Sequence, residues 1–151
     1  MSLVQKISDD LKLALKAREI SRTSFLRFVL SQIKNKEIEN KGRGESSELT
    51  DQEVIDVLTK ERKKRKEALF MFKSNGRDDL VRKEEEELVF FDDYLPKEIS
   101  EVEIKKIVDD IFNSGAKDFS DLMKATMQAV KGKADGKVVS EIVKEIIEKN
   151  K

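Results

Sequence analysis

The chain has 151 residues, in which 31 Lys and Arg balance 31 Asp and Glu, and it contains no His, Cys or Trp. The absence of imidazoles and thiols excludes Ser-His-Asp and Cys-His hydrolysis, disulfides, redox dithiols and ordinary structural zinc sites. Any catalysis would have to use carboxylates, lysines, arginines or hydroxyls. No arrangement of these groups in the sequence indicates a catalytic residue, a metal site or a cofactor, and we expect none.

Few residues interrupt the apolar pattern, because the chain has one Pro and six Gly. Apolar side chains recur at helical spacing, which excludes a disordered chain although 41% of the residues are charged. No apolar run approaches membrane-spanning length, and the N-terminus does not begin a signal peptide. Together with the lack of Cys, these features predict a cytoplasmic protein that has no membrane partner.

The first part of the chain is expected to form a pair of helices. Apolar side chains between Leu3 and Leu15 fall on one face of the first helix. Ser21 or Thr23 is expected to cap the second helix, which ends before a flexible loop at 42–47.

The third helix has a strong start signal. Thr50 and Glu53 are spaced as a capping box, in which each side chain accepts a hydrogen bond from the other residue's backbone N–H. The helix is expected to end at Asn75-Gly76 and to bury the aromatic run at 70–72. Asp78 is expected to cap a fourth helix.

The dipeptide Leu95-Pro96 ends the fourth helix, and three shorter helices are expected to follow. Their predicted caps are Ser100, Asp118 and Asp135, and Gly132 stops the second of them. The sequence thus predicts an all-α fold, with an N-terminal bundle of about four helices over 1–95 and a small C-terminal three-helix domain over 96–151. A single continuous bundle is the alternative.

The zero net charge conceals two consecutive segments of opposite charge. Residues 59–77 carry eight basic and two acidic side chains, and residues 78–93 carry eight acidic and two basic ones. A tight turn joins them, so they should lie antiparallel. Mutual pairing on a solvated face is one interpretation. A basic ridge for phosphates is the other, with Arg62, Lys66 and Arg77 as an auxiliary basic surface.

Two charged side chains interrupt the apolar stripe of the third helix. Glu61 and Arg65 follow Val57 at i+4 and i+8, where apolar side chains would face the core. A buried charge needs a partner or an opening to solvent, so these two positions favour some function.

A smaller basic site joins the last two helices. Three lysines flank a two-glycine loop that leads into a helix N-terminus, where free N–H groups and the positive helix pole attract phosphate. A plain turn, capped by Asp135 and with lysines for solubility, explains the same residues, and spacing alone favours it. The loop is not a P-loop, because no G-x-x-x-x-G-K-[ST] occurs. The candidate RNA-binding residues are Lys131, Gly132, Lys133, Asp135, Gly136 and Lys137.

Four segments resemble the YqeY-like family, and the resemblance extends over essentially the whole chain. The segments are Arg62 to Leu69, Asn75-Gly76-Arg77-Asp78-Asp79-Leu80, Tyr94-Leu95-Pro96-Lys97 and Lys131-Gly132-Lys133-Ala134-Asp135-Gly136-Lys137. The family is similar to the C-terminal helical and tail region of the B subunit of the aspartyl/glutamyl-tRNA amidotransferase. The resemblance implies an all-α, two-part structure whose tail grips tRNA.

The resemblance implies a non-catalytic tRNA-binding or adaptor module. Lys131, Lys133 and Lys137 would contact phosphate or ribose, and Asp135 would shape the loop. The family label is carbon-nitrogen ligase with glutamine as amido donor, but this chain lacks the catalytic groups that such an activity needs. Two alternatives stay open: an accessory part of a glutamine-dependent tRNA amidotransferase, with its subunits as partners, and a helical module that binds other proteins.

Overall fold

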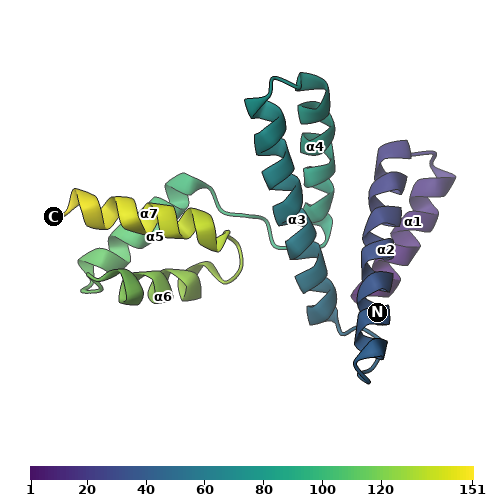
Figure 1. The fold of residues 1–151 in the computed structure, drawn as a ribbon, viewed down its shortest axis with the longest axis horizontal. Helices are drawn as coiled ribbons and strands as arrows, with labels where there is room; N and C mark the ends of the chain where they lie inside the picture. The colour runs from purple at the N-terminus through teal and green to yellow at the C-terminus, as the bar shows by residue number, and fades with distance from the viewer. The chain divides into compact units, whose positions relative to one another are not determined.

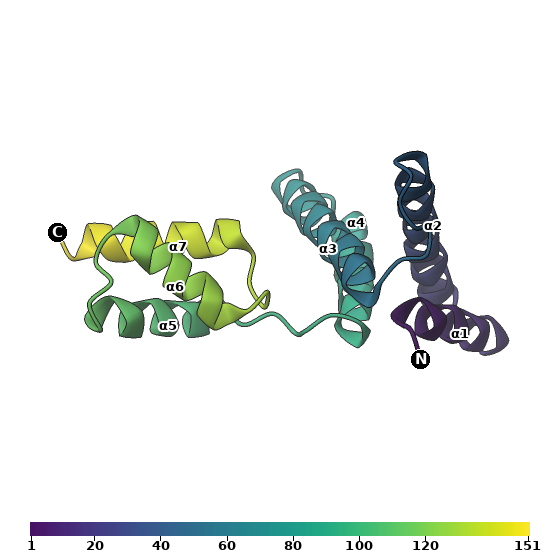
Figure 2. The same ribbon diagram turned by 90° about the horizontal axis from the view of Figure 1, so that it is seen from below.

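The computed structural model describes residues 1–151 and contains α-helices, one short 3-10 helix and no strand (Figure 1, Figure 2). The predicted all-α class is confirmed. The chain consists of two compact units, Met1–Leu95 and Pro96–Lys151. No helix has both the length and the apolar character that crossing a membrane would require.

Two helical hairpins and the 3-10 helix form the first unit. In chain order the elements are α1 (Leu3–Lys16), α2 (Ile20–Gly42), α3 (Asp51–Ser74), α4 (Asp78–Phe90) and η1 (Phe91–Asp93). The helix α1 pairs with α2, and α3 pairs with α4 (Figure 1). The core between them contains an edge-to-face pair of aromatic rings, Phe25 and Phe91, whose centroids lie 4.9 Å apart.

The capping box at the start of α3 is present as predicted. The Thr50 side chain accepts a hydrogen bond from the Glu53 N–H, and the Glu53 carboxylate accepts one from the Thr50 N–H. At the other end of the helix Gly76 is left-handed, with φ of 68°, and the Arg77 N–H bonds the Phe72 carbonyl at 3.0 Å.

Two predicted helix caps are wrong, by one residue in α4 and by at least two in α2. Helix α2 begins at Ile20, with Glu19 at its N-cap position, because a left-handed Arg18 (φ 57°) ends α1 and starts the next helix at once. Helix α4 has Arg77 at its N-cap position, so Asp78 is its first helical residue. In the first turn the Asp78 carboxylate still interacts favourably with the positive helix pole.

Phe70 and Met71 do not lie in the core as expected, whereas Phe72 is half-buried. Phe70 is 70% exposed and Met71 is 57% exposed. The fully buried side chains of α3 lie between Val54 and Arg62, so the second half of the helix extends beyond the main core.

The second unit is a bundle of three helices, α5 (Glu101–Asn113), α6 (Phe119–Val130) and α7 (Gly136–Lys149) (Figure 2). The predicted caps are present: the side chains of Ser100, Asp118 and Asp135 each accept a hydrogen bond from a backbone N–H of the following first turn. The buried core of this unit consists of Ile104, Val108, Leu122, Val139, Ile142, Val143 and Ile146.

Candidate nucleic-acid interface

The tail loop, residues 131–137, joins α6 to the first turn of α7, and hydrogen bonds hold its backbone. Lys131 ends α6 in the left-handed region with φ of 44°, and Gly132 follows at 76°. The Lys133 N–H donates to the Val130 carbonyl at 2.9 Å, and the Lys133 carbonyl accepts from the Ile99 N–H at 2.9 Å. The second bond ties the loop to the segment that precedes α5, so the loop is held from both sides.

All three lysines of the tail loop are exposed. The Asp135 carboxylate accepts a hydrogen bond from the Lys137 N–H at 3.0 Å, so the chain's own carboxylate occupies the N-terminus of α7. Any phosphate at this loop therefore depends mainly on the ammonium groups of Lys131, Lys133 and Lys137, and less on the free N–H groups that the sequence suggested.

The two segments of opposite charge form an antiparallel hairpin and pair with each other. Arg65 forms an ion pair with Glu87 and lies 3.6 Å from Glu84, and its guanidinium stands 4.9 Å from the centroid of the Phe28 ring. Lys73 pairs with Glu85 at 3.5 Å. Mutual pairing therefore accounts for part of the charge of the hairpin, and the buried pair explains why Arg65 is tolerated on an apolar stripe.

The three residues expected on an auxiliary basic surface occupy different environments. Arg62 is only 5% exposed, and burial lowers the pKa of its guanidinium while nearby Asp92 raises it. Arg62 therefore lies inside the fold and not on its surface. Lys66 is half-buried, and Arg77 is exposed with its guanidinium 3.5 Å from the Asp79 carboxylate.

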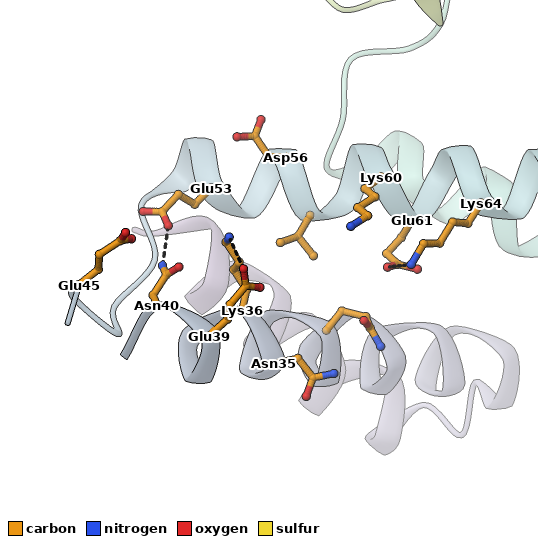
Figure 3. A pocket seen from close by; sticks show the side chains of 12 residues that line it. Asn35, Lys36, Glu39, Asn40, Glu45, Glu53, Asp56, Lys60, Glu61 and Lys64 are labelled. Atoms are coloured by element: carbon orange, nitrogen blue, oxygen red, sulfur yellow. Dashed lines mark hydrogen bonds and ion pairs between the residues drawn. The ribbon is translucent and has the colours of Figure 1, made fainter. Parts of the chain in front are cut away.

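A groove of about 430 Å³ between α2 and α3 was not predicted (Figure 3). At one end the Asn40 amide, 2% exposed, donates to the Glu53 carboxylate at 2.8 Å. Further along, the buried Glu61 carboxylate pairs with Lys64 at 3.4 Å, and Figure 3 shows both side chains at the groove wall. The one signal in the sequence was Glu61 on an apolar stripe.

Glu53, at one end of the groove, is poorly suited to act as a general acid. Hydrogen bonds from Asn40, and next from the Thr50 backbone, lower the pKa of Glu53, so this carboxylate is ionised at neutral pH and is a poor proton donor. The acidic side chains of the chain form no cluster of three or more that could hold a metal ion.

Tyr94 lies buried at the end of η1 and donates a hydrogen bond to the Asp10 carboxylate of α1. Burial, and next this hydrogen bond, raise the pKa of the Tyr94 hydroxyl well above its ordinary value. The phenol therefore stays neutral and joins η1 to α1, which is a structural role.

Comparison with known proteins identifies the family. A family model described as Yqey-like protein matches residues 4–147. The chain belongs to the YqeY-like family. The resemblance seen in the sequence motifs is thereby confirmed, and the tail loop and the charged hairpin both lie inside the matched YqeY-like region.

Curated relatives of this YqeY-like chain come from yeasts. "Altered inheritance of mitochondria protein 41, mitochondrial" of Saccharomyces cerevisiae S288c is 33% identical over 144 residues, which covers 95% of this chain and 68% of the relative. The protein of the same name from Kluyveromyces lactis is 36% identical over 91 residues, covering 60% of this chain and 47% of the relative. The relative from Lachancea thermotolerans is 36% identical over 92 residues, with 61% and 47% covered.

The names of these relatives correct one expectation. The sequence predicted a cytoplasmic protein, from the lack of Cys and of a targeting segment. The relatives are named as mitochondrial proteins, which contradicts that prediction. Cysteine usage is a weak guide here, because a chain without Cys is compatible with any redox compartment.

Proposed function

We propose that this YqeY-like chain is a non-catalytic RNA-binding module, that its ligand is tRNA, and that the tail loop contacts the phosphate backbone. One observation carries the proposal: three exposed lysines stand on a loop whose backbone is hydrogen-bonded on both sides. A loop that is already ordered loses little conformational entropy on binding, which favours affinity. The resemblance to the tail region of the amidotransferase B subunit supports tRNA as the ligand.

A binding role suits the chemistry of the chain better than a catalytic one. The sequence contains no imidazole or thiol, and Tyr94 is held neutral in the core. Within the proposal, any link to a carbon-nitrogen ligase is that of an accessory part or adaptor that positions tRNA for a separate amidotransferase. The relatives' names favour a mitochondrial location, which we include in the proposal.

In this proposal each of the two units has its own role. The second unit would be a separate small domain that presents the tail loop, and the first unit would be a helical domain that binds RNA or partner subunits through another surface. The separate hydrophobic cores of the two units support this division.

The proposal is tested by measuring tRNA affinity as a function of salt. The test variant changes Lys131, Lys133 and Lys137 to Ala. The matched control changes Lys105, Lys106 and Lys149, which are exposed lysines of the same unit, to Ala. Each phosphate contact that is lost should cost roughly 1 kcal/mol at low salt and reduce the slope of log affinity against log salt by about one.

Equal affinities for the two triple variants would show that the tail loop is not the contact. Failure of the unaltered chain to bind tRNA at low salt would reject the RNA-binding function itself. A loss of affinity confined to the tail-loop variant, with unchanged helicity, is the outcome that supports the proposal.

A further inference from the structure

Phe70 is the most exposed aromatic side chain of the chain, at 70%. It lies in the second half of α3, beyond the buried part of that helix. A single exposed apolar side chain is common and needs no explanation, so the surroundings of Phe70 decide whether its exposure has a function.

The surroundings of Phe70 are basic. Lys63, Lys66 and Lys73 stand at i−7, i−4 and i+3 from Phe70, so the four residues share one face of α3. From position 63 to 77 the sequence has six basic residues and one acidic residue, Glu67. Lysines thus precede and follow the exposed ring on one helix face, and Glu67 at i−3 is the one acidic residue beside it.

The acidic helix α4 neutralises only part of this charge. Arg65 points inward and is held by Glu87. The pair between Lys73 and Glu85 is 3.5 Å long and about half exposed, and exposed pairs of this kind are weak enough to exchange for a phosphate. Lys63 is exposed.

We propose that this face, called here the α3 platform (Lys63, Lys66, Phe70 and Lys73), binds an unpaired segment of RNA. A base stacks on the Phe70 ring, and the neighbouring phosphates contact the lysines. Single-stranded nucleic acid is recognised by this combination of an aromatic face and a basic track. An acidic peptide would satisfy the lysines but would not require an aromatic ring. The inference rests on the proposed function, since it assumes that RNA is the ligand, but it concerns the other unit of the chain.

A single tryptophan can report stacking directly, because the chain has none of its own. The variant Phe70→Trp places the only indole on the α3 platform. Addition of a fifteen-nucleotide oligouridylate (a length of about one site) should quench its fluorescence in a saturable way that weakens with salt. The control is Val89→Trp on α4, an exposed apolar position with Glu85 and Glu86 at i−4 and i−3, and its fluorescence should not change.

A second comparison separates stacking from simple apolar contact. The change Phe70→Leu keeps an apolar side chain but removes the ring, so the affinity for the oligonucleotide should fall about fivefold or more, whereas Phe70→Trp should retain it. Equal binding by Phe70→Leu, or unquenched fluorescence of Phe70→Trp, overturns the platform and points to a protein partner for this face.

The two proposals fail separately. The tail-loop variant with Lys131, Lys133 and Lys137 changed to Ala is measured on tRNA, and Phe70→Trp is measured on the oligonucleotide. If the tail-loop variant matches the unaltered chain on tRNA while the fluorescence of Phe70→Trp is still quenched, the tail-loop contact is wrong and the α3 platform stands. If the fluorescence of Phe70→Trp is unquenched while the tail-loop variant loses tRNA affinity, the α3 platform is wrong and the tail-loop contact stands.

Discussion

The guanidinium of Arg65 on α3 forms an ion pair with the carboxylate of Glu87 on α4, and their side chains are only 15% and 10% exposed. Glu84 stands 3.6 Å from the same guanidinium, and the Phe28 ring lies beside it. A charge this far from water is stable only while its partner is present. The pair therefore sets how α3 and α4 align, which in turn places the outer face of α3.

Removing one member of the pair should destabilise the protein strongly. The change Arg65→Met leaves the Glu87 carboxylate buried without its guanidinium, and we expect the free energy of unfolding to fall by about 3 kcal/mol. Changing both residues, Arg65→Met with Glu87→Leu, should recover most of the loss. The measurement is urea unfolding at neutral pH.

An exposed pair of the same hairpin provides the control. Lys73→Ala removes the pair with Glu85, in which both side chains are about half exposed, and should cost under about 1 kcal/mol. If Arg65→Met lowered the free energy of unfolding no more than Lys73→Ala does, the buried pair would contribute no more to stability than the exposed one.

Much of the local structure was predictable, because its causes are local. The box of Thr50 with Glu53 and the caps Asp118 and Asp135 depend on residues within one helical turn of each other. The charged interruption of the α3 stripe was also visible in the sequence, and it marked the place where a buried ion pair forms.

The features that sequence reasoning missed depend on how far one helix overlaps another. Periodicity shows which face of α3 is apolar, but not that its buried part ends near Arg62, so Phe70 was expected inside and Arg62 outside. The groove was missed because its hydrogen bond from Asn40 to Glu53 joins two helices across a loop.

Tyr94 should titrate abnormally, and as the only tyrosine it can be followed alone. Burial raises the pKa of its hydroxyl above the ordinary value of 10.0. The neutral phenol thus contributes stability that is complete below pH 10 and is lost as pH rises toward the pKa of the folded state. Phenolate absorbance should therefore appear only well above pH 10 in the native chain, and at ordinary pH in denaturant.

The contribution of the Asp10 partner can be separated from that of burial. Asp10→Asn removes the negative charge that opposes ionisation, so the pKa of the Tyr94 hydroxyl should move down without reaching its ordinary value, since burial is the larger cause. A native chain whose phenolate forms as readily as in denaturant would contradict the buried position of Tyr94.

Lys131 offers a way to separate tail-loop binding from folding. A non-glycine residue in the left-handed region costs about 1–2 kcal/mol, and Lys131 has φ of 44°. Lys131→Gly removes this cost and adds about 0.5–1 kcal/mol of chain entropy to the unfolded state, so stability should rise by up to about 1 kcal/mol. Affinity for tRNA should fall, because one ammonium group is lost.

The matched control is Lys133→Gly, whose backbone is not left-handed. It should destabilise the chain by about 0.5–1 kcal/mol while lowering the affinity for tRNA to a similar extent. Parallel losses of stability and affinity in both variants would mean that the loop acts on binding only through folding.

Asp135 should oppose RNA binding while supporting the helix. Asn caps helices as well as Asp does, so Asp135→Asn should leave stability nearly unchanged and remove a negative charge from among three lysines. Affinity for tRNA should rise several-fold at low salt, and the gain should shrink as salt screens it.

Asp135→Ala, which loses the cap, should cost about 1 kcal/mol of stability. An Asn variant with unchanged affinity would place the phosphate away from this helix terminus.

The separate core of the second unit predicts that it folds alone. The segment Pro96–Lys151 encloses its own buried cluster of aliphatic side chains and needs no residue of the first unit to complete it. A domain of this size is only marginally stable, so the fragment should be helical by circular dichroism and should unfold cooperatively at a modest temperature. It should also retain the salt-dependent binding of tRNA that we propose for the three tail-loop lysines. The whole protein is compared with the fragment in the same melting experiment. If the whole protein unfolds cooperatively but the fragment does not, the two units fold as one, and the tail loop can be studied only in the whole protein.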